Sequence, residues 1–126
     1  MTDNEKATEV FYATIRSKYP IPDDLVLQWY MMAVADYELD IGPLQYDGQN
    51  NLINSSYTVI NTIGLIMSKY YVKRELSRIN KLDSVIGKDI QLNSTGVAKK
   101  AVKSEYDGIL EEIEAKLHKQ KRHAFN

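Results

Sequence analysis

Residues 56–83, SYTVINTIGLIMSKYYVKRELSRINKLD, decide the fold of this chain. Apolar side chains recur here at the three- and four-residue spacing of one helix face, from Tyr57 and Ile60 to Ile79 and Leu82. No proline interrupts the pattern. The spacing therefore predicts a single helix of about 28 residues, which is about 42 Å long at 1.5 Å per residue.

Two shorter helical patterns precede this stretch. Residues 3–18 repeat apolar side chains at helical spacing, and either Thr2 or Asp3 can cap the start of the helix. A second helix is predicted over 24–41, where a proline and two carboxylates open the pattern and Gly42-Pro43 closes it.

Two further segments complete the helical pattern. Residues 45–55 are rich in turn-forming residues, and the pair Asp47-Gly48 predicts a tight turn. Near the end of the chain, apolar side chains from Val102 to Leu117 predict a last helix over 97–120.

The connection between the two long helices, residues 86–96, reads IGKDIQLNSTG. Its Gly87-Lys88 pair does not make a phosphate-binding loop, because the Walker spacing is absent and the carboxylate of Asp89 would repel phosphate. The short alternation Ile90-Gln91-Leu92 instead predicts a loop or small hairpin that protrudes from the molecule.

These elements predict a mostly α fold, a small antiparallel helical bundle in a single domain, 1–126. A compact chain of this length is about 36 Å across, so a long helix must either kink or project. Gly64 is the candidate kink. We expect projection of the last helix, followed by a C-terminal tail at 118–126 that nothing within the subunit orders.

Composition argues against several classes of function. The chain has no cysteine, and its two histidines, His118 and His123, do not share a helix face. No nucleophile stands beside a general base, and no apolar run approaches the roughly 20 residues of a membrane span. We therefore expect a protein without enzymatic activity, cofactor, metal or membrane contact, made in the cytosol.

Charge is distributed unevenly along the chain. Residues 1–60 carry three cations against nine carboxylates, a net charge of −6, and residues 61–126 carry thirteen cations against eight carboxylates, a net charge of +5. Two interpretations stay open at this point. The charges are solvated faces, or the acidic part of one copy meets the basic part of the next copy in a head-to-tail ring.

A basic face runs along the long helix. It also has two readings, a track for nucleic-acid phosphates or ordinary charge that is solvated or paired between subunits. Glu75 and Asp83 interrupt the face, and the pI of about 6.1 favours the second reading. The residues are Lys69, Lys73, Arg74, Arg78 and Lys81.

Three runs of sequence together resemble a known family. They are PDDLVLQWYMMAVADYELDIGPLQYD (22–47), YYVKRELSRINKLDSVIGKDIQLNSTGVAKKAVKSEYDGILEEI (70–113) and HKQKRHAFN (118–126). In these runs the chain resembles the head-tail connectors, or head-completion adaptors, of long-tailed double-stranded DNA bacteriophages. These adaptors carry no catalytic signature.

The resemblance implies a structural protein of the virion neck, assembled in the host cytoplasm. Its copies would form a ring, commonly dodecameric, that docks on the portal protein, extends the DNA channel and carries the stopper or tail-completion protein. Double-stranded DNA would pass through without sequence-specific contact.

The resemblance also implies roles for two segments. The loop would contact a neighbouring subunit or the stopper through Lys88, Asp89, Ile90, Gln91, Leu92 and Asn93. The tail would bind the portal through Lys119, Gln120, Lys121, Arg122, His123, Ala124, Phe125 and Asn126. Two alternatives remain, a DNA-binding accessory factor that uses the basic face of residues 69–81, and a helical regulator that binds a partner protein.

Overall fold

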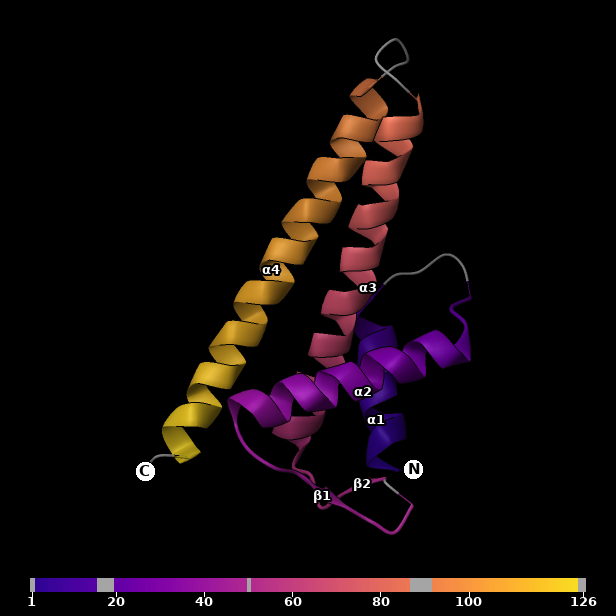
Figure 1. Ribbon diagram of the computed structural model, residues 1–126. Helices are drawn as coiled ribbons and strands as arrows, with labels where there is room; N and C mark the ends of the chain where they lie inside the picture. The colour runs from indigo at the N-terminus through magenta and orange to yellow at the C-terminus, as the bar shows by residue number, and fades with distance from the viewer. Residues whose placement is uncertain (1, 16–19, 50, 87–91, 125–126) are drawn as a thin grey trace.

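The computed structural model describes residues 2–15, 20–49, 51–86 and 92–124, with side chains for all of these except 80–86, 92–99 and 121–124. Four helices and one small antiparallel sheet make up the described part of the chain (Figure 1). The elements are α1 (Asp3–Thr14), α2 (Asp23–Asp40), β1 (Gln45–Tyr46), β2 (Leu52–Ile53), α3 (Tyr57–Ile86) and α4 (Leu92–Ala124).

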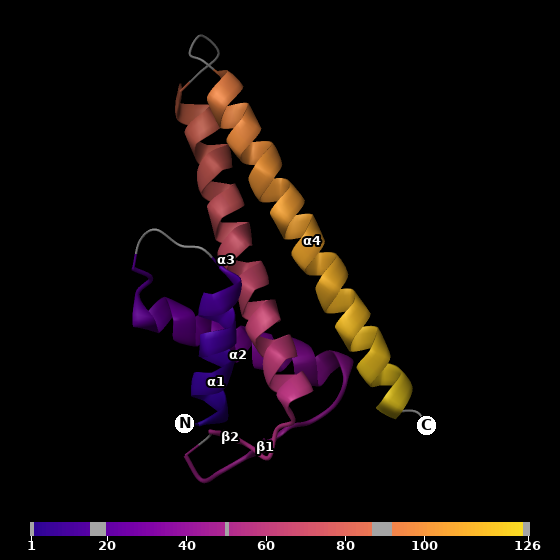
Figure 2. The same cartoon turned by 180° about the vertical axis from the view of Figure 1, so that it is seen from behind.

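The long helices α3 and α4 run antiparallel and form a helical hairpin (Figures 1 and 2). Helices α1 and α2 pack against the N-terminal half of α3, where α2 crosses it. The C-terminal half of α3 and the beginning of α4 extend together beyond α1 and α2. The mostly α fold with two long helices is therefore confirmed.

The projection differs from the one expected. The C-terminal part of α4 returns to the base of the molecule, where Ile113 and Leu117 are buried in the core. Because the helices are antiparallel, this end of α4 lies at the same end of the molecule as the N-terminal end of α3, and the two helices diverge toward it (Figures 1 and 2). The two long helices project together, at the ends that face their connection.

The loop predicted at residues 86–96 extends too far toward the C-terminus. Helix α3 ends at Ile86 and α4 begins at Leu92, so Leu92 and Asn93 belong to a helix. Asn, Ser and Thr are common both in turns and at helix starts, and the sequence pattern alone does not separate these two settings. The other predicted loop residues, Lys88 to Gln91, lie outside the described residues.

Residues 45–55 contain a hairpin that the sequence pattern did not reveal. Strands β1 and β2 pair in the register Gln45↔Ile53 and Tyr46↔Leu52. The carboxylate of Asp47 accepts the backbone N–H groups of Gln49 at 2.8 Å and Asn51 at 2.9 Å, and these bonds lower the pKa of Asp47. The turn expected at Asp47-Gly48 is thus confirmed, within a larger hairpin.

Three aromatic rings join three helices in the core. Phe11 of α1, Trp29 of α2 and Tyr71 of α3 contact one another edge to face, with centroids 5.9 to 6.2 Å apart. Each such pair contributes about 0.5–1.5 kcal/mol beyond the burial of apolar area. The cluster fixes α1 and α2 on the same half of α3.

Gly64 allows α1 to approach α3 closely. A Cβ atom at position 64 would lie 2.6 Å from Cγ1 of Val10 and 2.8 Å from the backbone carbonyl oxygen of Ala7. Ala7 is fully buried in this contact. The sequence marked Gly64 as a candidate kink. In the structure α3 continues on both sides of this glycine, and α1 crosses α3 there.

We expect Gly64→Ala to lower the free energy of unfolding by about 1–3 kcal/mol, because the backbone of α1 must move away from α3. Gly108 in α4 provides a matched control, since a Cβ atom there meets nothing within 4 Å. Gly108→Ala should raise stability by about 0.5–1 kcal/mol through helix propensity. Urea denaturation measures both values, and equal responses of the two variants would contradict the close approach.

Candidate functional site

The basic face divides into paired and exposed cations. Lys69 lies 3.3 Å from the carboxylate of Asp36 on α2, and Arg78 lies 3.2 Å from Glu75. Lys73 and Arg74 are exposed to solvent. The side chain of Lys81 lies outside the described residues. The described cations of the basic face therefore lie on α3, but carboxylates of the same subunit already neutralise part of their charge.

Asp36 is the junction between α2 and this basic face. Besides Lys69, it accepts a hydrogen bond from the hydroxyl of Tyr70. Burial, together with the bond to Asp36, raises the pKa of Tyr70 well above its usual value. The ammonium of Lys69 also lies 4.5 Å from the centroid of the Tyr70 ring. A carboxylate of α2 thus already binds a cation of α3 inside one subunit.

The predicted C-terminal tail is in large part helical. Helix α4 continues to Ala124, and within the predicted tail the subunit holds Gln120, so the expectation that nothing within the subunit orders the tail is wrong for this residue. Lys119 is exposed, whereas Gln120 is half-buried and bonded to two other helices. Phe125 and Asn126, the last two predicted portal-binding residues, lie outside the described residues.

Gln120 ties the end of α4 to α2 and α3. Its side-chain oxygen accepts a hydrogen bond from the hydroxyl of Tyr37, and its Nε2 donates to Oγ1 of Thr62 at 2.9 Å. Thr62 is fully buried and donates in turn to the carbonyl oxygen of Thr58 at 2.8 Å. Sequence reasoning missed this anchor, because the partners of Gln120 are 83 and 58 positions away in the chain.

Asn4 plays the equivalent role at the other end of the base. Its Oδ1 accepts the hydroxyl of Tyr30 at 2.6 Å and the backbone N–H of Leu52 at 3.0 Å. Its Nδ2 donates to Oδ1 of Asn51 at 3.0 Å. One side chain of α1 therefore holds both α2 and the β hairpin. Burial, reinforced by the negative charge of Asp3, raises the pKa of Tyr30 to about 12.

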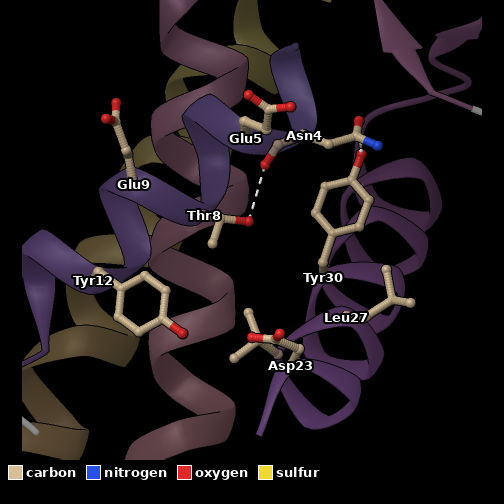
Figure 3. A pocket seen from close by; sticks show the side chains of 9 residues that line it. Asn4, Glu5, Thr8, Glu9, Tyr12, Asp23, Leu27 and Tyr30 are labelled. Atoms are coloured by element: carbon tan, nitrogen blue, oxygen red, sulfur yellow. Dashed lines mark hydrogen bonds between the residues drawn. The ribbon is translucent and has the colours of Figure 1, made fainter. Parts of the chain in front are cut away.

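An open groove of about 420 Å³ lies between α1 and α2 (Figure 3). Tyr12 of α1 stands on one side of it, and Leu27 and Tyr30 of α2 stand on the other. The charged residues that line the groove are all carboxylates: Glu5, Glu9 and Asp23. The groove therefore combines aromatic and apolar walls with a negative potential.

The outer face of α2 continues from this groove as an exposed apolar stripe. We define the α2 stripe as Leu27, Met31, Met32 and Leu39, whose exposed fractions are 55%, 63%, 39% and 87%. The opposite face of α2 is buried. Tyr30 and Val34 lie on this buried face. The sequence places apolar residues on two sides of this helix. The spacing of these residues therefore does not show which side is buried within the subunit.

Neither metal-binding nor membrane-spanning features occur in the described part of the chain. Its acidic and histidine side chains do not gather in any group of three that could hold a metal ion. None of its helices is both long enough and apolar enough to cross a membrane. Comparison with protein-family models, with curated protein sequences and with solved structures found no match for this chain.

The raised pKa of Tyr30 predicts a loss of stability at alkaline pH. Between pH 10 and about 12 the unfolded state releases the Tyr30 proton while the folded state keeps it, so unfolding becomes easier as the pH rises. Tyr30→Phe removes this contribution, and it also removes the bond to Asn4, which costs about 1 kcal/mol at neutral pH.

The stability gap between the wild-type chain and Tyr30→Phe should therefore shrink as the pH rises through this window. Urea denaturation at a series of pH values measures the gap. Tyr57→Phe is the control variant, because Tyr57 is 73% exposed. A gap for Tyr30→Phe that stays constant from pH 9 to 12 would show that Tyr30 is not held in its protonated form by folding.

Proposed function

We propose that this chain is a ring-forming structural adaptor in the neck of a long-tailed double-stranded DNA bacteriophage. In this proposal its copies assemble in the host cytoplasm, dock on the portal protein and extend the DNA channel. The ring then offers an attachment platform to the stopper or tail. The resemblance of residues 22–47, 70–113 and 118–126 to head-tail connectors supports this proposal, and the α2 stripe is the observation that carries the assembly role.

The α2 stripe supports assembly because such a surface is costly to leave in water. A helix that is apolar on all sides is normally buried on all sides. Four of the seven large apolar side chains that are exposed in the described part of the chain lie on α2, and apolar side chains gathered on one surface mark interaction sites more than scattered ones do. A role in which α2 is covered by another chain accounts for both of its faces.

The projecting hairpin of α3 and α4 supports the same role. Its far half extends beyond the base that α1 and α2 form, and it offers a long lateral surface. In this proposal the whole α3–α4 hairpin takes the role that the sequence analysis gave to a protruding loop or small hairpin at residues 86–96. Its contacts with a neighbouring subunit or the stopper remain a proposal.

Fewer C-terminal residues are available for the proposed portal contact than the sequence analysis expected. Gln120 is bonded to Tyr37 and Thr62, so it is not available to a portal protein without breaking these bonds. Lys119 is exposed and remains a candidate, together with residues 121–126. Cations at this position would steer the ring toward an acidic portal surface.

Electron microscopy of the tailed particles that carry this chain tests the proposal. We expect a ring of its copies between portal and tail, with a central channel, and purified full chain should form rings of the same diameter. Absence from purified particles would contradict the proposal. Absence combined with submicromolar binding to duplex DNA, lost in Arg74→Ala, would favour the DNA-binding alternative.

A further inference from the structure

We propose that the α2 stripe binds the projecting α3–α4 hairpin of the next copy, in a head-to-tail contact. The inference rests on the self-association in the proposed function, and it names the two surfaces that meet. The partner that covers the α2 stripe is a second copy of this chain, and charge complementarity is the reason for this choice.

The charged side chains of α2 itself and of the adjoining groove are all carboxylates, and Lys69 of α3 reaches α2 at Asp36. Between residues 19 and 68 the chain contains no lysine, arginine or histidine. Asp23 and Asp24 lie in the first turn of α2, and Glu38 lies in its last turn. The adjoining groove adds Glu5 and Glu9. A partner for this surface must therefore present apolar side chains together with cations.

The α3–α4 hairpin presents this combination. Lys73, Arg74 and Arg78 are exposed on α3, and Lys100 and Lys103 are exposed on α4. Apolar side chains on both helices are half-buried in the subunit, namely Leu76, Ile79, Val102 and Tyr106, and the last two pack against its core. Glu75, Glu105 and Asp107 interrupt the cations. Cations still outnumber carboxylates on these segments, so the described part of the hairpin is a predominantly cationic surface with partly exposed apolar side chains.

Charge also decides between a head-to-tail and a two-fold contact. If two α2 stripes met each other, the carboxylates of one copy (Asp23, Asp24 and Glu38) would approach those of the other, and like charges in contact weaken association. Contact with the hairpin places carboxylates against cations. The ion pair between Asp36 and Lys69 already joins α2 and α3 in this way within one subunit.

The two surfaces lie apart in one subunit. The α2 stripe extends from Leu27 to Leu39, about 18 Å along the helix axis at 1.5 Å per residue. The C-terminal half of α3 continues beyond α1 and α2 (Figures 1 and 2). The stripe and the hairpin also lie on different parts of the molecule, so each copy keeps both surfaces available, and repeated contacts build a ring or a filament.

Cysteine cross-linking tests the contact cleanly, because the chain has no native cysteine. Met31→Cys in one full-length chain and Arg74→Cys in a second, differently tagged chain should give a cross-linked heterodimer when mixed with a bismaleimide reagent. Each variant alone should give only background. Gly48→Cys, at the open turn of the β hairpin, replaces Arg74→Cys in the control mixture.

Each outcome decides the inference. A heterodimer well above the control supports it, and Leu39→Lys in the Met31→Cys chain should then weaken self-association by about tenfold or more. A strong homodimer of Met31→Cys alone would overturn it, because two α2 stripes would then meet across a two-fold axis. A yield of heterodimer no higher than in the control would also overturn the inference. If electron microscopy nevertheless shows rings, the proposed function is kept and the copies associate through a different interface.

Discussion

The close approach of α1 to α3 at Gly64 is the constraint on which the rest of the structure depends. Val10 and the backbone of Ala7 occupy the space where a Cβ atom would otherwise lie. With α1 held there, Phe11 reaches the rings of Trp29 and Tyr71, and Asn4 reaches Tyr30 and the β hairpin. Helix α2 packs mainly on α3 and is also held by α1, and its outer face is left in solvent.

Burial of α2 is thus only half completed within one subunit. Its inner face supplies Trp29, Tyr30 and Tyr37 to the core, and Tyr37 also holds Gln120 at the end of α4. Its outer face offers large apolar side chains within acidic surroundings. In the proposed head-to-tail contact the basic, projecting hairpin supplies the complementary chemistry, and one chain would then carry both halves of the interface. A ring of identical copies is the assembly that this proposal predicts.

The helices could be predicted from the sequence, because proline, glycine and apolar spacing act locally. Residues 24–41 and 56–83 correspond closely to α2 and α3. The β hairpin could not be predicted, since its two-residue strands depend on Asn4, far away in the chain. The start of α4 at Leu92 was missed, because the residues that follow it are equally common in turns and in first helical turns.

The candidate site was harder to predict for the same physical reason. Charge separation and the basic face of α3 are visible in the sequence, but the pairing of Lys69 with Asp36 depends on how α2 crosses α3. The anchor at Gln120 depends on the positions of Tyr37 and Thr62. The α2 stripe escaped detection because a helix that is apolar all round has no periodicity that distinguishes its inner face.

Methionine oxidation tests the central claim, that other copies cover the outer face of α2. Met31 and Met32 are 63% and 39% exposed in the subunit, whereas Met67 is fully buried and serves as an internal control. Dilute hydrogen peroxide followed by mass spectrometry reports the oxidation rate of each, in dilute subunit and in concentrated, assembled protein. The account predicts that assembly slows oxidation of Met31 and Met32 and that Met67 stays slow throughout. Oxidation of Met31 in assembled rings at the rate of the dilute subunit would contradict it.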